Sequence, residues 1–380
     1  MKKCFKKIIG ILAAALIWMS SVVLNVTAEE EPDLIYILIE TETGTVLEEN
    51  RSDEQVNAGY LTKLMSLLLV AEDIETGKYS LDTVLTASQT VYGTKGSVVW
   101  LEPGDKMTVD ELLKAVIIGN ANDAMTVLAE ESEQSVDDFV LRMNSTAFDY
   151  GLRDSAFYSP YGYYDEREYT TAHDIALICA ELAEYSFLEP YFKTWRDFIK
   201  EGQTELVNEN TLSRTYERHI GFKASHSEQS GYCIAEGARS EDGASYISIV
   251  LGAPDEDASF STAKKLVKKG FSDYKVTVPG FLDEFMRPVQ VRNGVDSAVE
   301  TGLKSQRAIV VPKGVSELSN VIVLPEYVEA PLEKGQRIGT AAFYNGDTLV
   351  YETDIVAKDK VEKLTMWYVF KKMLLNLIEN

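Results

Sequence analysis

The sequence predicts an α+β domain, followed by a small all-β domain and a helical tail. The chain has 380 residues, which is too long for one ordinary hydrophobic core and suits two domains. Up to about Tyr274 the patterns run in the order strands, several helices, then strands, which is typical of α+β architecture. After Val278-Pro279-Gly280 the runs become short and β-rich. We therefore expect domains at 29–274 and 275–358, and a tail at 359–380.

Residues 1–28 have the pattern of a secretory signal peptide. Four lysines precede an apolar run that begins at Ile8, and Val26-Thr27-Ala28 resembles the small-residue pattern before a cleavage point. A retained membrane anchor is the alternative, because the run is slightly long for a signal. With either interpretation the rest of the chain is expected to work outside the cytoplasm, at the outer face of the cell membrane.

The first elements of the α+β domain are a hairpin and a helix. Residues 34–39 are apolar and β-branched, and a turn at Gly44 leads into a return strand. Residues 61–76 follow a helical pattern, with Gly77 just after its end.

Further helices are predicted before the sheet resumes. Thr108 and Glu111 have capping-box spacing, so a helix begins there. Residues 135–151 form an amphipathic pattern, with Ser135 as the N-cap and Gly151 as the stop, and residues 170–185 form another.

The domain is expected to close with two strands and a helix. Residues 231–253 read as two strands joined at Asp242-Gly243, a strong hairpin signal, and residues 259–271 return to a helical pattern. In the second domain, Asn345-Gly346 predicts another hairpin.

The tail is predicted to be an amphipathic helix. Such a helix can lie in a membrane interface, or it can pack on the β-domain, and the pattern does not decide between the two. Its apolar stretch is too short to span a bilayer. One face carries Leu364, Trp367, Phe370, Leu374 and Leu377, with Lys363, Lys371 and Lys372 beside it.

Charge and residue usage exclude several classes of partner. The formal net charge of −23 argues against nucleic acid, because phosphate binding needs a basic surface. Of three cysteines, Cys179 and Cys233 lie in a helical and a strand pattern and are expected to be buried small hydrophobes. The three histidines show no ligand spacing, so we expect neither a metal site nor a cofactor.

Three short fragments suggest a catalytic site. Lys63 lies one helical turn after Tyr60, and positions i and i+3 share a helix face. Asn120 and Asn122 lie in a turn between two apolar runs, and Lys223 lies just ahead of a predicted strand. A lysine so placed can take the proton of a serine nucleophile, but each fragment alone is weak.

Together these fragments resemble the serine D-alanyl-D-alanine carboxypeptidases, the low-molecular-weight penicillin-binding proteins. That class and its relatives carry S-x-x-K, a serine–asparagine turn and K-T-G. The resemblance extends over about residues 33–363. It includes "AGYLTKLMSLLLV", "GSVVWLEPGDKMTVDELLKAVIIGNANDAMTVLAE", "FVLRMNSTAFDYGLRDSAFYSPYG", "YTTAHDIALI", "GFKASHSEQSGYCIAEGA" and "APLEKGQRIG".

The resemblance implies a fold, a reaction and a substrate. The fold would be a β-lactamase/transpeptidase-like domain, an antiparallel sheet with helices, followed by the small β-domain. In the family, a serine activated by the first lysine attacks the terminal D-Ala–D-Ala bond of peptidoglycan stem peptides. The turn moves protons and holds the substrate, while K-T-G binds its carboxylate and lines the oxyanion hole. Penicillin mimics the substrate and acylates the serine.

This chain keeps only part of that pattern. The nucleophile position holds Tyr60, and the general-base position holds Lys63. The remaining catalytic positions hold Asn120, in place of the turn serine, and Asn122. The substrate-binding positions hold Lys223, Ala224 in place of threonine and Ser225 in place of glycine.

These changes predict a site without its chemistry. Loss of a serine nucleophile lowers turnover by about 10⁶ in subtilisin. Tyr60 has a hydroxyl whose pKa Lys63 could lower, but its ring would fill the space where substrate approaches. Ser225 adds a side chain where close backbone approach is needed. Lys63, Asn122 and Lys223 are then expected to satisfy one another in a buried polar cluster.

Two functions follow from this pattern. The first is a catalytically silent or impaired wall protein that binds peptidoglycan stem peptides or a wall-synthesis partner. The alternative is an active D-alanyl-D-alanine carboxypeptidase that uses Tyr60 or an unforeseen group.

Overall fold

The structure is a computed structural model that describes residues 33–163, 165–280 and 286–378. The predicted signal peptide lies outside the described residues. The α+β part and the β-rich part are described separately below.

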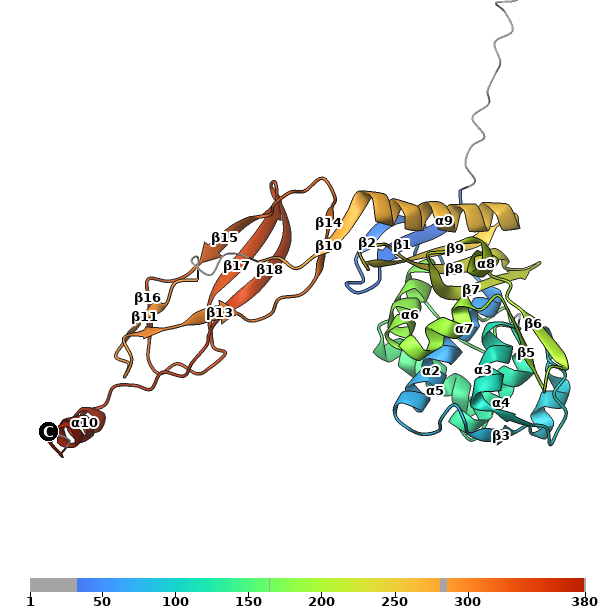
Figure 1. Cartoon of the computed structure of the whole chain (residues 1–380), viewed down its shortest axis with the longest axis horizontal. Coiled ribbons are helices and arrows are strands. Elements are labelled where there is room, and N and C mark those ends of the chain that lie inside the picture. Colours follow the sequence, from blue (N-terminus) through green and yellow to red (C-terminus); the bar gives the residue numbers. More distant parts are fainter. Residues whose placement is uncertain (1–32, 164, 281–285, 379–380) are drawn as a thin grey trace, which may run out of the picture. The chain divides into compact units, whose positions relative to one another are not determined.

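A five-stranded antiparallel sheet forms the centre of the α+β part (Figure 1). The strands nearest in sequence pair through tight turns, so the predicted hairpins at Gly44 and at Asp242-Gly243 are confirmed, with φ of 65° at Gly44 and 92° at Gly243. The strand order is β2 (Val46–Asn50), β1 (Ile35–Glu40), β9 (Ser245–Ala253), β8 (Gly231–Arg239) and β7 (His219–Ser227).

Both faces of this sheet are covered because its central strands are apolar on both sides. Along β1, Ile37 and Ile39 join a large core with the helices of one face, whereas Leu38 joins a second core under α9 (Glu256–Asp273). This alternation follows from the two-residue period of a strand. Figure 1 shows α9 on one side of the sheet and the helices between residues 63 and 193 on the other.

The helices begin and end close to the predicted positions. The capping box of Thr108 and Glu111 is present, and Ser135 caps its helix by accepting from the Asp138 N–H. Cys179 and Cys233 are buried free thiols, as predicted. The helices opposite α9 include α2 (Lys63–Glu75), α3 (Val109–Ile117), α4 (Asn122–Ser132), α5 (Val136–Asp149) and α6 (Ala172–Glu184).

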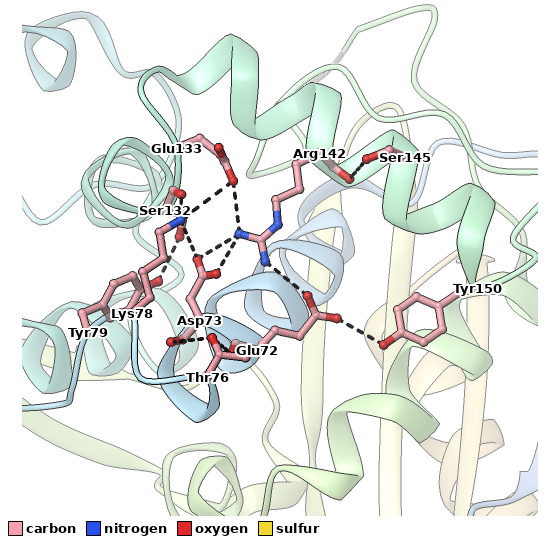
Figure 2. Close-up of polar contacts among 10 residues, drawn as sticks. All are labelled: Glu72, Asp73, Thr76, Lys78, Tyr79, Ser132, Glu133, Arg142, Ser145 and Tyr150. Atoms are coloured by element: carbon pink, nitrogen blue, oxygen red, sulfur yellow. Dashed lines mark hydrogen bonds and ion pairs between the residues drawn. The ribbon is translucent and has the colours of Figure 1, made fainter.

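A charged cluster links α2 to its neighbours (Figure 2). Arg142 on α5 pairs with Asp73 at 2.8 Å, with Glu72 at 3.2 Å and with Glu133 at 3.3 Å. The Asp73 side chain is only 6% exposed, so its charge needs compensation, which comes from this guanidinium and, at 3.7 Å, from Lys78. The cluster thereby fixes the far end of the helix whose first residue is Lys63.

Several short elements were not predicted. The strands β5 (Arg196–Ile199) and β6 (Thr204–Val207) are four residues each, and their apolar residues come in adjacent pairs rather than in alternation, so they gave no strand signal. These elements are β3 (Val84–Thr86), β4 (Lys106–Thr108), β5 (Arg196–Ile199), β6 (Thr204–Val207), α7 (Glu189–Lys193), α8 (Leu212–Thr215) and the 3₁₀ turns η1 (Gly59–Thr62), η2 (Gln89–Gly93) and η3 (Ser186–Leu188).

The β-rich part consists of small sheets around two apolar clusters. The hairpin predicted at Asn345-Gly346 joins β17 and β18, and Gly346 has φ of 58°. Its strands are β10 (Tyr274–Thr277), β11 (Val289–Arg292), β12 (Ala298–Val299), β13 (Thr301–Leu303), β14 (Ile309–Pro312), β15 (Ser319–Val323), β16 (Tyr327–Glu329), β17 (Arg337–Asn345) and β18 (Thr348–Ala357).

The tail forms the helix α10 (Met366–Ile378), as predicted. Two of its apolar side chains are open to solvent, with exposed fractions of 72% for Trp367 and 54% for Phe370. Among the residues that the structure describes, no helix is long and apolar enough to cross a membrane.

Candidate functional site

The predicted site residues meet where η1, the turn before α4 and strand β7 come together. Gly59 has φ of 56°, and a Cβ there would stand 3.0 Å from the hydroxyls of Ser225 and Ser230. Glycine is therefore needed at the start of the turn that carries Tyr60. The edge strand β7 then brings Lys223 and Ser225 to the same turn.

Tyr60 fills the nucleophile position with a half-buried ring. Its hydroxyl lies beside the Asn122 amide and the Ser97 backbone. The Tyr60 hydroxyl fits at this place because residue 96 is glycine. A Cβ on Gly96 would lie 2.5 Å from the phenol oxygen. Burial raises the pKa of Tyr60, and hydrogen bonding to Asn122 offsets this only in part. The expectation that Lys63 lowers this pKa is wrong, because desolvation dominates.

Lys63 is fully buried at the first turn of α2. Its Nζ donates to the Tyr161 carbonyl at 3.1 Å and lies 4.1 Å from the centroid of the Tyr60 ring. Burial, and then the charge of Lys223, place the pKa of Lys63 well below its usual value. The amine stands over the ring face, and no hydrogen bond within the described residues joins it to the Tyr60 hydroxyl.

Asn120 and Asn122 shape the opposite wall of the site. Asn120 adopts φ of 57°, a left-handed conformation that asparagine tolerates. Its Nδ2 donates to Glu209 at 3.1 Å, and Asn122 Nδ2 donates to the Lys95 carbonyl at 2.6 Å. Both side-chain oxygens are buried and lack a partner among the described residues.

Lys223 is buried and held by backbone. Its Nζ donates to the carbonyls of Val116 and Ile117, at 3.1 and 3.0 Å, at the C-terminal end of α3. This contact satisfies carbonyls that a helix end leaves free and suits the helix dipole. Burial lowers the pKa of Lys223 to about 8. The hypothesis that Lys63, Asn122 and Lys223 satisfy one another is therefore wrong, because each donates to a main-chain carbonyl.

The two altered residues after Lys223 lie on opposite sides of β7. Ala224 joins the apolar cluster under α9, so the structure does not bring it beside Tyr60. Ser225 faces the site, is 3% exposed and accepts a hydrogen bond from the Tyr60 N–H at 3.0 Å. In acyl transfer, the N–H of the nucleophile residue is a usual oxyanion-hole donor. Here that donor is already occupied.

Glu209 is a site residue that the sequence analysis missed. It follows β6, its side chain is exposed, and its Oε2 accepts from Asn120. Its negative charge adds to the rise in the pKa of Tyr60. At Lys63 and Lys223 the same charge opposes the lowering of the pKa by burial. The residue belongs to none of the three fragments, so no local spacing could have indicated it.

Two contacts bear on whether the site could carry out serine-type acyl transfer. Such chemistry needs a nucleophile within hydrogen-bond reach of its base. It also needs free donors where the oxyanion develops. In the described part of the chain, the Lys63 nitrogen donates to the Tyr161 carbonyl rather than to the Tyr60 hydroxyl, and the Tyr60 N–H is bonded to Ser225.

Comparisons with known proteins agree with the fold and the fragments. The sequence model of D-alanyl-D-alanine carboxypeptidase matches residues 25–255, and that of the penicillin-binding protein 5 C-terminal domain matches residues 271–363. D-alanyl-D-alanine carboxypeptidase DacF of Bacillus subtilis is 29% identical over 86% of this chain and 85% of its own length. DacC of Escherichia coli is 28% identical over 86% and 84%.

Solved structures show the same architecture. Penicillin-binding protein 5 from Haemophilus influenzae matches with a TM-score of 0.79 at 24% identity, over 87% of this chain and 97% of that one. The predicted α+β fold with its β-rich second part is thereby confirmed. The chain belongs to the D-alanyl-D-alanine carboxypeptidase family, the low-molecular-weight penicillin-binding proteins of peptidoglycan metabolism.

Proposed function

We propose that this protein is a catalytically silent, or strongly impaired, member of its family that binds peptidoglycan stem peptides or a wall-synthesis partner. The observation that carries the proposal is the hydrogen bond from the Tyr60 N–H to Ser225 Oγ. It places a hydroxyl where an acyl oxygen would need a donor, at the same residue that lacks the serine nucleophile.

The state of Tyr60 supports the same conclusion. A phenol attacks as a phenolate, and burial raises the pKa of Tyr60 rather than lowering it. A nucleophile with a raised pKa is less often in its reactive form at neutral pH. The retained scaffold around it, including the buried Lys63 and Lys223, preserves a shaped surface without the reacting group.

An active carboxypeptidase is the second candidate. One observation favours it: the pKa of Lys63 is lowered, as a general base requires. Relatives such as the Bacillus subtilis protein carry the name D-alanyl-D-alanine carboxypeptidase. This candidate needs Tyr60 to leave its position beside Asn122 and Ser97 and meet the lysine amine.

We further propose that the mature chain starts after Ala28 and acts at the outer face of the cell membrane, with α10 at the lipid surface. The exposed apolar side chains Trp367, Phe370 and Met373 support this, because an amphipathic helix buries such a face in the interface. Replacing Trp367 and Phe370 with alanine should reduce co-sedimentation with lipid vesicles. Unchanged sedimentation would contradict this placement.

Labelling with a fluorescent penicillin, followed by intact-mass analysis, tests the silent site. We expect no covalent adduct on folded wild-type protein. A stable adduct on Tyr60 would establish the active candidate instead. A second assay measures binding of stem peptides and of wall-synthesis enzymes, and a folded protein that binds neither would refute the binding role.

A further inference from the structure

The site offers few free donors to an anionic ligand. Lys63 and Lys223 are both buried, and each directs its nitrogen to main-chain carbonyls. The Tyr60 N–H is bonded to Ser225. A ligand carboxylate would therefore have to displace Ser225 from the Tyr60 N–H, and the donors that the two lysines leave unused lie on buried side chains.

An acidic group stands at the same site and is accessible. Glu209 is exposed, and its Oε2 accepts a hydrogen bond from Asn120 Nδ2 at 3.1 Å. Within the described residues, no other hydrogen bond or ion pair of this carboxylate is found. Its charge acts on Tyr60, Lys63 and Lys223, which places it in the same electrostatic environment as the predicted site. The other carboxylate oxygen of Glu209, Oε1, can therefore accept a hydrogen bond from a cationic group of a ligand.

The turn that contains Asn120 and Asn122 is a second, independent indication that the ligand donates hydrogen bonds. Asn120 and Asn122 are 2% and 0% exposed, and both Oδ1 atoms lack a hydrogen-bond partner in the described part of the chain. Their amide orientations are determined by their acceptors, because each Nδ2 faces an oxygen, of Glu209 or Lys95. The turn therefore contributes unpaired acceptors, which strengthen the negative potential beside Glu209.

We propose that this site selects its ligand through a cationic primary amine that pairs with Glu209, rather than through a C-terminal carboxylate. The inference rests on the proposed function, because it names the group by which a stem peptide containing a diamino acid would be recognised. The net charge of −23 favours the same ligand, since an acidic protein attracts cations and repels free carboxylates.

Three matched peptides test this preference. The parent probe is Nα-acetyl-L-Lys–D-Ala–D-Ala, with a free side-chain amine and a free C-terminal carboxylate. One derivative has the amine acetylated, and the other has the carboxylate amidated. Calorimetry at low salt should show affinity falling on the order of tenfold on acetylation, and no such loss on amidation. Added salt should weaken binding of the parent peptide.

Two variants assign the effect to one carboxylate. Glu209→Gln should make binding insensitive to acetylation, whereas Glu201→Gln, an exposed glutamate in the β5–β6 turn, should retain the preference. The inference is wrong if amidation costs more than acetylation, or if Glu209→Gln keeps the amine preference. If none of the three peptides binds folded wild-type protein, stem-peptide binding itself is refuted along with the inference. Equal binding of all three refutes the inference alone.

Discussion

The bond between Ser225 and the Tyr60 N–H predicts that restoring the nucleophile alone will restore little chemistry. Tyr60→Ser recreates the serine one turn before Lys63, but the amide of residue 60 still donates to Ser225 Oγ at 3.0 Å. Tyr60→Ser combined with Ser225→Ala recreates the serine and also frees the amide. The two variants differ by one hydroxyl.

The difference in acylation rate between these two variants lies between two limits. If Ser225 Oγ rotates away when a ligand binds, only a hydrogen bond worth about 1 kcal/mol is lost, which is roughly fivefold in rate. If it stays, an oxyanion-hole donor is lost, which lowers the rate by about 10²–10³. Ser225 is 3% exposed, so its hydroxyl has little space to rotate. We expect the double variant to be acylated about 10² times faster than Tyr60→Ser.

The assay is the rate of adduct formation with fluorescent penicillin, followed by intact mass. Ser227→Ala, on the same strand, is the matched control, because the Ser227 hydroxyl bonds Ser230 and not residue 60. Hydrogen exchange of the residue-60 amide, which Ser225→Ala should accelerate, checks the bond without any chemistry. Equal acylation of the single and double variants, or unchanged exchange, would refute the reasoning.

Three further predictions concern stability, measured by urea unfolding. Because the pKa of Lys223 falls from 10.5 to about 8 on folding, the unfolded chain binds more protons between these values. The free energy of unfolding should therefore rise by up to about 3 kcal/mol between about pH 8 and pH 10.5 because of this group. Lys223→Met should flatten that rise. A pH profile of the variant that runs parallel to that of the wild type would contradict this. Arg142→Ala removes the nearest counter-charge of the buried Asp73 and leaves only Lys78 at 3.7 Å, so it should cost about 2 kcal/mol. Arg167→Ala, at an exposed pair with a side chain 66% exposed, should cost much less; equal losses would contradict the burial argument. Gly162→Ala would place a Cβ 2.0 Å from the Gly59 carbonyl oxygen and should destabilise by more than about 2 kcal/mol. Gly104→Ala, which also has positive φ but meets nothing within 4 Å, should cost about 1 kcal/mol, and a Gly162 effect no larger would be inconsistent with the clash.

Much of the fold was accessible from sequence because its signals are local. The capping box at Thr108 and Glu111 and the turns at Gly243 and Gly346 each occupy a few consecutive residues. The β5–β6 hairpin was missed because its strands are short and their apolar residues do not alternate, so its own sequence shows no strand periodicity. Its prediction would have required knowledge of tertiary packing.

The structure brings Tyr60, Lys63, Asn122 and Lys223 together, but their hydrogen bonds were not predicted. The resemblance to the family indicated these residues, yet their partners are main-chain atoms and residues far away in sequence. The Tyr161 carbonyl binds Lys63, and a carbonyl belongs to every residue, so it leaves no trace in the sequence. Glu209 joins the site only because the fold brings the segment after β6 beside Asn120.

The attachment of both lysines to backbone carbonyls affects how sequences of this kind should be classified. Lys63 contacts the segment around Tyr161, and Lys223 caps the end of α3, so each lysine contributes to the scaffold whether or not a substrate is ever turned over. A sequence search that scores these lysines would recognise the scaffold and report an enzyme. If the proposed function holds, the difference lies at positions 60 and 225, three residues before the first lysine and two after the second. A genome survey that counts cell-wall hydrolases should then read those two positions first.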